Sequence, residues 1–260
     1  MGAAIFIPGD EPGWFVASEL ARGPWDPGAQ HGGAPAALLV GAIEALPAAE
    51  GLQLARLTFE LLRPVPIGRV RLDATVARGG RRVQLSEAAL WDESGVELVR
   101  VRALHVARAD APASPVPHPP PPPGQGREND MIPPFSTMFA PDAMEVRFVS
   151  GAFMPRGPAT AWFRLRVPVV AGEPVTALQR LAAAGDFGNG ISAPISWAEY
   201  VFINPDLTLS VERVPEGEWI ALQSTTRVAP GGIGVSESVL YDARGRVGRA
   251  VQSLLVAPRG

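Results

Sequence analysis

The chain of 260 residues contains no cysteine, which excludes disulfide bonds, thiol nucleophiles and thiolate metal sites. Its three histidines, His31, His105 and His118, are scattered and include no helical pair at the spacing of metal ligands. A zinc enzyme is therefore not expected. We predict a protein that works without a metal or another cofactor.

Basic clusters and long apolar runs are missing as well. The net charge is −3, 19% of the residues are charged, and basic residues do not gather in a block, so a surface for nucleic acid is not expected. No apolar run approaches the roughly 18 to 20 residues that span a bilayer. The stretch MGAAIFIPGD lacks the basic region of a secretory signal, and residue 6 is Phe where a myristoylation signal needs Ser or Thr. These absences predict a cytoplasmic protein.

Proline is concentrated near the middle of the chain. Residues 111–126 read APASPVPHPPPPPGQG, which is too rich in proline for a helix or a sheet interior and predicts an extended connector. Proline also interrupts the stretch that follows, and a strand-like alternation resumes at Met144. We therefore predict a first unit at residues 1–109, a linker at 110–142 and a second unit at 143–260.

The two units repeat one another at an interval of 150 residues. Residues 86–95 read SEAALWDESG, and residues 236–245 read SESVLYDARG. Without gaps, the match extends over about fifty residues and aligns Thr75 with Thr225 and Arg63 with Arg213. Chance similarity would not keep one register across four strand-like segments and their turns. The sequence therefore predicts a duplicated unit.

Four segments of each unit have the pattern of strands joined by short turns, which predicts an antiparallel meander with one apolar face to be covered. In the first unit they are Leu54–Leu62, Arg69–Ala77, Val83–Trp91 and Glu97–Val106, and in the second unit they begin at Leu207, Trp219, Ile233 and Val247.

The segment Ala34–Leu46 carries only one charged residue, Glu44, and predicts a buried helix. We expect the matching helix of the second unit around residues 174–186. A curved antiparallel sheet wrapped around one buried helix is the hotdog fold. We therefore predict an α+β protein, a double hotdog of two tandem units.

Three stretches of the sequence resemble a known family. They are HGGAPAALL at residues 31–39, LAAAGDF at 181–187 and LYDARGRVGRAVQSLL at 240–255. The chain is similar in these stretches to the double-hotdog acyl-CoA thioesterases, a thioesterase-like superfamily related to bacterial thioesterase II. The resemblance covers nearly the whole chain apart from the linker. It implies the hydrolysis of acyl-CoA thioesters to free fatty acid and CoA.

The same resemblance implies a set of catalytic residues. In the family, an Asp at the end of the second helix, a Ser or Thr on the next strand and a Gln on the last strand hold and activate a water molecule. The Asp and the Gln fall on Asp186 and Gln252. The strand PISWAEYVFIN aligns only by length, which leaves two serines for the hydroxyl, and we choose Ser196 over Ser192. Where the relatives have an Asp-His pair, this chain has Trp-Ala-Glu at 197–199.

The residues themselves support two readings of Asp186. A carboxylate at the end of an apolar segment is costly to bury without a partner, which favours a functional role as a general base. The alternative is a helix-end Asp bonded to local backbone. In the gapless alignment Arg102 takes the position of Gln252, and the first helix has no counterpart of Asp186. We therefore place the chemistry in the second unit.

The start of the first predicted helix offers a second group of candidate residues. His31, Gly32 and Gly33 stand where free backbone amides and the helix dipole favour negative charge. We propose their amides as oxyanion or CoA-facing donors, and a glycine turn that enters a buried helix is the alternative. Glu87 and Glu237 fall on the apolar side of their strands and are identical in both units, so we interpret them as structural.

Two other functions stay open at this stage. Asp26 and His31 have the spacing of the hotdog enoyl-CoA hydratases, although the Asn-Pro pair of that motif is missing. A non-catalytic module that binds acyl-CoA or lipid is the other alternative. The acyl chain length, the choice between CoA and a carrier protein, and the oligomeric state, including a homo-oligomer, cannot be read from the sequence.

Overall fold

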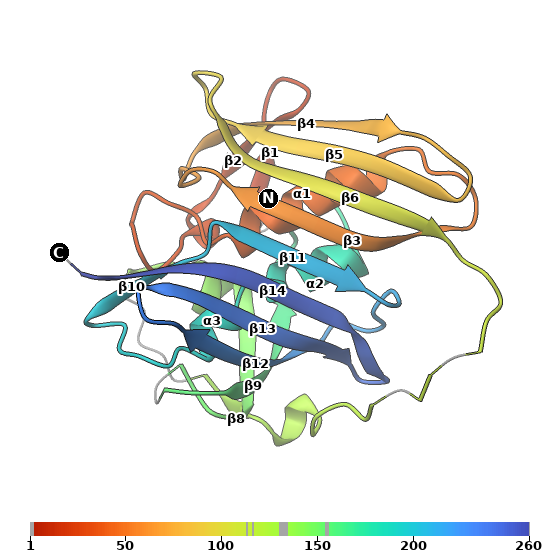
Figure 1. Ribbon diagram of the computed structural model, residues 1–260. Coiled ribbons are helices and arrows are strands. Elements are labelled where there is room, and N and C mark those ends of the chain that lie inside the picture. The colour runs from red at the N-terminus through yellow and green to blue at the C-terminus, as the bar shows by residue number, and fades with distance from the viewer. Residues whose placement is uncertain (1–2, 113, 116, 130–134, 154–155, 260) are drawn as a thin grey trace.

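The computed structural model describes residues 3–112, 114–115, 117–129, 135–153 and 156–259 (Figure 1). The strands of the described residues form one antiparallel sheet, whose middle strands lie in front of the helices in this view and whose end strands β9 and β8 bend behind them. The elements of the first unit are β1 (Phe6–Pro8), β2 (Trp14–Ala17), η1 (Glu19–Ala21), α1 (Gly33–Ala45), β3 (Leu52–Leu61), β4 (Arg69–Arg78), β5 (Val83–Trp91) and β6 (Glu97–Ala107). Those that follow are η2 (Pro123–Gln125), β7 (Arg127–Glu128), η3 (Phe139–Ala143), β8 (Met144–Ser150), β9 (Ala159–Leu165), α2 (Ala177–Gly185), α3 (Gly188–Ile191), β10 (Tyr200–Ile203), β11 (Asp206–Val211), β12 (Ile220–Val228), β13 (Ile233–Asp242) and β14 (Gly245–Pro258).

The strand order is nearly symmetric about the centre of the sheet. It runs β1-β2-β4-β5-β6-β3-β11-β14-β13-β12-β9-β8-β7, with β10 paired to β14. At the centre β3 pairs with β11, and Thr58 lies opposite Thr208. These residues are 150 positions apart, so each faces its own counterpart in the other unit. The pairing places a pseudo-twofold axis between the units, and the predicted double hotdog is confirmed.

The predicted meander is right for three strands of each unit and wrong for the first. Strands β4, β5 and β6 follow one another in space, but β3 pairs with β6 on one side and with β11 on the other. Without this pairing, β3 and β11 would each expose an edge with unpaired backbone N–H and C=O groups. Because the two strands pair with each other, these groups are satisfied and the sheet has two fewer open edges.

Helices α1 and α2 lie side by side and run antiparallel under the concave side of the sheet (Figure 1). At one end of the pair, a Cβ added to Gly33 would lie 2.6 Å from the backbone oxygen of Ala183. At the other end, Thr176 donates to the carboxylate of Glu44 at 2.5 Å. The start of α1 therefore lies beside the end of α2, which brings two segments remote in sequence to one place.

Each helix is explained by its local sequence. Helix α1 is apolar on nearly all sides because sheet and helix α2 enclose it; Leu39, for example, is 0% exposed. Truncating such a leucine to alanine costs about 2–5 kcal/mol of stability. Helix α2 begins with a capping box, in which Thr176 and Gln179 each accept the backbone amide of the other.

The described part of the linker packs against the second unit. The indole N–H of Trp162 donates to the backbone oxygen of Pro121 at 2.7 Å, and β7 pairs with β8. Helix η3 then leads directly into β8. The predicted linker of residues 110–142 therefore includes a strand, β7, that extends the sheet of the second unit, in addition to the extended connector that the sequence predicts.

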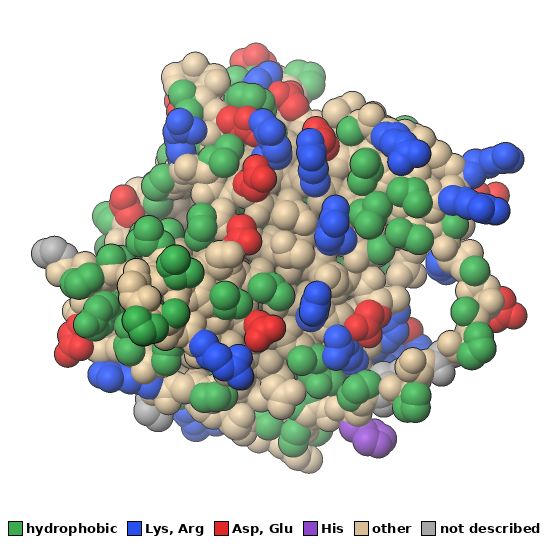
Figure 2. Space-filling model, in the orientation of Figure 1, with side chains coloured by type: hydrophobic (Ala, Val, Ile, Leu, Met, Phe, Trp, Pro, Cys, Tyr) green, Lys and Arg blue, Asp and Glu red, His purple; other side chains and the backbone are tan. Residues whose placement is uncertain are grey.

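The outer face of the sheet carries charged side chains of both signs (Figure 2). Glu87 pairs with Arg102 at 2.7 Å, and Glu237 pairs with Arg227 at 3.4 Å. The placement of Glu87 and Glu237 on the apolar sides of their strands was therefore wrong, because both carboxylates lie on the outer face. The inward positions of β13 next to helix α3 are the small residues Ser236 and Ser238, because a Cβ added to Gly188 of α3 would lie 3.1 and 2.7 Å from their hydroxyl oxygens.

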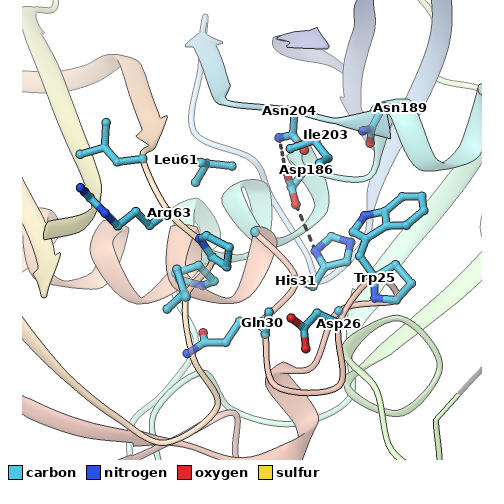
Figure 3. A pocket seen from close by; sticks show the side chains of 18 residues that line it. Trp25, Asp26, Gln30, His31, Leu61, Arg63, Asp186, Asn189, Ile203 and Asn204 are labelled. Atoms are coloured by element: carbon cyan, nitrogen blue, oxygen red, sulfur yellow. Dashed lines mark hydrogen bonds and ion pairs between the residues drawn. The ribbon is translucent and has the colours of Figure 1, made fainter. Parts of the chain in front are cut away.

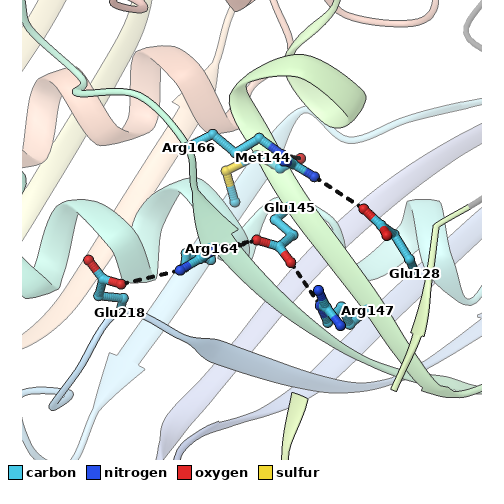
Figure 4. A network of polar contacts seen from close by, with 7 residues as sticks. All are labelled: Glu128, Met144, Glu145, Arg147, Arg164, Arg166 and Glu218. Atoms are coloured by element: carbon cyan, nitrogen blue, oxygen red, sulfur yellow. Dashed lines mark hydrogen bonds and ion pairs between the residues drawn. The ribbon is translucent and has the colours of Figure 1, made fainter. Parts of the chain in front are cut away.

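A second group of ion pairs lies on β8 and β9 (Figure 4). The buried carboxylate of Glu145 accepts hydrogen bonds from Arg147 at 2.8 Å and from Arg164 at 2.5 Å. Burial acts to raise the pKa of Glu145, but the hydrogen bonds from the two arginines outweigh it and leave the pKa below its ordinary value.

The helices of the described residues are all too short or too polar to cross a membrane.

Candidate active site

A cavity of about 380 Å³ lies where the two units meet (Figure 3). This volume falls within the range of small-molecule sites. The first unit contributes the loops around residues 23–35 and 61–65. The second unit contributes Asp186, Asn189, Ile203 and Asn204. The cavity therefore contains the start of α1 and the end of α2.

Asp186 caps the C-terminal end of α2 and is 5% exposed. Its Oδ1 atom accepts hydrogen bonds from Nδ2 of Asn204 at 2.8 Å and from Nε2 of Gln252 at 3.1 Å. The two amides hold the carboxylate in one orientation. Its other oxygen, Oδ2, faces the first unit, where Nδ1 of His31 lies 3.1 Å away.

Gln252 links Asp186 to helix α3. Its Oε1 atom accepts the backbone amide of Asn189 at 3.1 Å. A backbone N–H can only donate, so this bond fixes the amide with Nε2 toward Asp186. Gln252 is 1% exposed. The structure therefore brings together two of the three residues that the family resemblance implies, Asp186 and Gln252.

His31 lies between aromatic rings at the wall of the cavity. Its ring stacks on Phe187 at 4.5 Å and lies 5.0 Å from Phe139, measured between ring centroids. The backbone amide of Gly33 donates to Nδ1 of His31 at 3.1 Å. A side chain at Gly32 would collide with Asp186, because its Cβ would lie 2.8 Å from Oδ2. Glycine at this position thus permits the close approach of the two units.

The three amides proposed as oxyanion donors have different partners. The amide of His31 donates to the backbone oxygen of Ala21, and that of Gly33 to the imidazole of His31. Among the described residues, the amide of Gly32 has no acceptor in the protein. Of the proposed group, Gly32 is therefore the residue with an amide left for a ligand.

The structure does not bring the predicted hydroxyl group to Asp186. Ser196 accepts the backbone amide of Ala198 at 3.3 Å, in the turn before β10. Ser192 donates to the backbone oxygen of Gly188 and contacts the hydroxyl of Thr226 at 2.7 Å. Within the described residues neither serine bonds to Asp186.

Asn204, which the sequence analysis missed, takes the place beside the carboxylate. It stands between β10 and β11, directly after the apolar strand YVFI. The signal for Asn204 in the sequence was its place as a polar residue directly after an apolar strand.

The structure changes the alignment of the two units at their last strands. Trp91 pairs with Glu97, six positions on, whereas Tyr241 pairs with Arg246, five positions on. The first turn is thus one residue longer, and the gapless register slips by one. Gln252 lies opposite Ser236, and the residue opposite Ser86 is Ala103. Ala103, not Arg102, is therefore the counterpart of Gln252.

With Ala103 as the counterpart of Gln252, the two units still differ in the polar residues of the site. Ala103 is buried and has no polar side-chain atom, so the first unit cannot hold a carboxylate in the way that Gln252 does. Within the described residues, moreover, no three His, Asp or Glu side chains gather as the ligands of a metal ion would.

Asp26 has a local role. Its Oδ1 atom accepts the backbone amide of Gly28 at 2.7 Å in an exposed turn. The carboxylate that contacts His31 is that of Asp186. The pairing of Asp26 with His31 that a hydratase requires is not among the contacts of the described residues, and we do not propose hydration.

Comparisons with known proteins agree with this architecture. Solved structures with the same fold include a provisionally assigned thioesterase II from Thermobifida fusca YX, with 20% identity, a TM-score of 0.73 and coverage of 97% of this chain and 95% of that one. A hot dog protein of unknown function from Alicyclobacillus acidocaldarius has 15% identity, a TM-score of 0.72 and coverage of 97% and 95%. The acyl-CoA thioesterase II TesB2 of Mycobacterium marinum has 18% identity, a TM-score of 0.67 and coverage of 96% and 94%.

Sequence comparison identifies the family. No curated protein matches the chain. The acyl-CoA thioesterase N-terminal domain matches residues 21–106, and the acyl-CoA thioesterase C-terminal domain matches residues 111–256. The chain therefore belongs to the acyl-CoA thioesterase family and is a thioester hydrolase.

Proposed function

We propose that the protein hydrolyses acyl-CoA thioesters to a free acid and CoA, and that Asp186 activates the attacking water. The observation that carries this proposal is the position of Asp186 at the junction of the units. Its carboxylate lines the cavity, is held on one oxygen by Gln252 and Asn204, and contacts His31 with the other.

In the proposed reaction, a water molecule between the carboxylate and the thioester carbonyl loses a proton to Asp186. The hydroxide oxygen bonds to the carbonyl carbon, and the carbonyl oxygen takes up negative charge. When the tetrahedral intermediate collapses, the carbon–sulfur bond breaks and CoA leaves as a thiolate. The proton held at Asp186 then passes to the thiolate or to solvent, which regenerates the carboxylate. A positioned general base typically contributes about 10² to 10⁴ in rate.

Two groups are suited to stabilise the oxyanion. The amide of Gly32 lies at the start of α1, where the helix dipole favours negative charge. The side chain of Asn189 also lines the cavity. Its backbone amide is bonded to Gln252, which fixes the start of α3. Removing one such donor typically costs about 10²- to 10³-fold in kcat.

Asn204 replaces Ser196 in this proposal as the partner of Asp186. Its Nδ2 atom donates both to Asp186 and to the backbone oxygen of Asp206 at 3.2 Å. Both partners accept hydrogen bonds, so the amide is fixed with Nδ2 toward them. The oxygen of the amide is then available to a donor such as the attacking water.

The test measures thiol release from a panel of acyl-CoAs that differ in chain length. The wild type should release CoA, and Asp186→Asn should lower kcat about 10²- to 10⁴-fold, because an amide cannot accept the proton of the water. Asp26→Asn is a matched control, since it changes another carboxylate of the cavity that serves only a local turn. Its kcat should stay within twofold of the wild type.

The alternative of a non-catalytic binding module has a distinct outcome. Such a module would bind acyl-CoA, and its thiol release would equal that of buffer for both the wild type and Asp186→Asn. That result would overturn the proposed function.

A further inference from the structure

Arg63 and Arg213 are counterparts in the two units and differ in their partners. Each stands two residues beyond the end of its strand, β3 or β11, and these strands pair through the counterparts Thr58 and Thr208. The duplication provides an internal control. If the arginine of one unit pairs with a buried carboxylate and its counterpart in the other unit does not, the second arginine is a candidate for a role outside the fold.

In the second unit the arginine serves the fold. Its two terminal nitrogens donate to the two carboxylate oxygens of Asp242, each at 2.5 Å. Asp242 is 0% exposed and also accepts the backbone amides of Glu216 and Arg244. Arg213 thus neutralises a buried carboxylate through two hydrogen bonds, and this bidentate geometry makes the ion pair strong.

In the first unit the corresponding aspartate is occupied elsewhere. Asp92 accepts the backbone amides of Ser94 and Val96 and the hydroxyl of Ser94 within its own, longer turn. Arg63 keeps a bond to backbone, from Nη1 to the oxygen of Glu97 at 3.1 Å. No carboxylate lies within ion-pair distance of Arg63 among the residues that the structure describes.

Arg63 is exposed at the rim of the cavity that contains Asp186. The other ionisable side chains of the lining are Asp26, His31 and Asp186, so Arg63 is the lining residue with a permanent positive charge. Figure 3 places Arg63 and Trp25 on opposite sides of the pair formed by His31 and Asp186. Among the lining residues, the cation therefore lies at one end and the aromatic surface at the other; the guanidinium of Arg259, which is not part of the lining, lies over the Trp25 ring at 5.3 Å and donates to the backbone oxygen of Trp197.

We propose that Arg63 binds the phosphate groups of the CoA part of the substrate. This inference rests on the proposed function, because it assigns the two ends of an acyl-CoA to the two ends of the same cavity. CoA carries its negative charge on phosphates remote from the thioester, and an arginine without a carboxylate partner is suited to bind them. The acyl chain then extends past Trp25 and Ile203, two apolar side chains that are 39% and 51% exposed.

The test compares two substrates with the same acyl group, the acyl-CoA that the wild type hydrolyses fastest and the corresponding acyl-pantetheine, which has no phosphate. For Arg63→Ala, the KM for the acyl-CoA should rise about tenfold with kcat unchanged, as expected for the loss of one charge-assisted contact at an exposed site. The KM for acyl-pantetheine should not change. Arg63→Lys should recover part of the loss, because lysine keeps the charge without the planar fork.

A matched control removes an exposed arginine elsewhere. Arg227 is 73% exposed and pairs with Glu237 on the outer face of the sheet. Arg227→Ala should leave both KM values unchanged. Raising the salt concentration should increase the KM of the wild type for acyl-CoA, since salt screens exposed charges, and should have less effect on Arg63→Ala.

Two outcomes would overturn the assignment of Arg63. One is a KM for acyl-CoA that Arg63→Ala leaves within twofold of the wild type. The other is an equal rise for acyl-CoA and acyl-pantetheine, which would indicate a structural effect on the loop. If the wild type hydrolyses nothing, the proposed function fails, but calorimetric binding of coenzyme A still tests Arg63. Binding that is about tenfold weaker in Arg63→Ala than in the wild type supports the proposal, and equal binding refutes it.

Discussion

The Nδ1 atom of His31 lies 3.1 Å from Oδ2 of Asp186, so a helix start in the first unit contacts a helix end in the second. The amide of Gly33 also lies 3.1 Å from the same nitrogen. The nitrogen has one in-plane position for a hydrogen bond and cannot at once accept the amide and donate to the carboxylate. In the tautomer with its hydrogen on Nδ1 the ring can donate to Asp186, and in the other neutral tautomer Nδ1 can accept the amide of Gly33.

The first prediction concerns this contact. His31→Phe keeps an aromatic ring against Phe139 and Phe187 and removes the nitrogen. Nδ1 is then absent both as a donor to Oδ2 of Asp186 and as an acceptor for the amide of Gly33, so whichever bond it makes is lost. We expect kcat to fall about 10- to 100-fold, with a melting temperature within a few degrees of the wild type, because general acid–base groups contribute on this scale or above. Steady-state kinetics and thermal unfolding measure the two quantities.

The control for His31 is a variant that keeps a nitrogen. His31→Gln retains a polar side chain, and if its nitrogen reaches Asp186 it should recover part of the lost kcat. If His31→Phe retained the kcat of the wild type, the contact would have no part in catalysis.

The second prediction concerns Gln252, which bridges Asp186 and the amide of Asn189. Gln252→Ala removes the hydrogen bonds of this side chain to the carboxylate and backbone oxygen of Asp186 and to the amide of Asn189. We expect a loss of about 1–3 kcal/mol in the free energy of unfolding, because a buried amide is left without an acceptor. We also expect kcat to fall at least tenfold, since Oδ1 of Asp186 then keeps only its hydrogen bond from Asn204. Ser236→Ala, which changes the residue opposite Gln252, should leave kcat within twofold.

The third prediction separates Asn204 from Ser196. Asn204→Ala removes a hydrogen bond to the carboxylate, so kcat should fall at least tenfold. Ser196→Ala should leave kcat within twofold, because the hydroxyl accepts only a local amide. The opposite result, a large loss for Ser196→Ala and none for Asn204→Ala, would return the serine to the role that the family resemblance gave it. Thiol release under saturating substrate measures both.

The fold could be predicted because its signals are periodic and repeated. The strand alternation, the apolar segment at 34–46 and the repeat at 150 residues each reflect a whole element, so an error of one residue does not change the conclusion. The pairing of β3 with β11 could not be predicted in this way. It depends on a contact between two units, and no local pattern specifies which strand edges meet.

The site could be predicted only in part, for a related reason. Asp186 and Gln252 stand in short motifs, whereas Asn204 depends on where a strand ends. The contact of Asp186 with His31 depends on the antiparallel arrangement of α1 and α2. The slip of one residue between Arg102 and Ala103 shows the same limit, because one additional residue in a turn reverses the face on which each later side chain lies.

The fourth prediction concerns the ion pair of the buried Asp242 with the partly exposed Arg213, which ties the end of β11 to the last hairpin. Burial acts to raise the pKa of Asp242, but the hydrogen bonds from Arg213 and from the amides of Glu216 and Arg244 outweigh it, so the pKa lies below its ordinary value. The bonds therefore favour the ionised form in the folded state. The stability that they contribute is fully present above the pKa of an unfolded aspartate, about 3.9, and is lost as the pH falls through the lower pKa of the folded state.

Asp242→Asn should accordingly lower the free energy of unfolding at pH 7 by about 3 kcal/mol, because Arg213 and two backbone amides lose a charged acceptor. The variant should also lose less stability than the wild type between pH 5 and pH 2, since it no longer has this carboxylate to protonate. Glu145 has a lowered pKa as well, so part of the acid sensitivity will remain. Denaturant unfolding at several pH values measures both effects. If the difference between Asp242→Asn and the wild type were as large at pH 2 as at pH 7, the ionised form of Asp242 would not be what stabilises the hairpin.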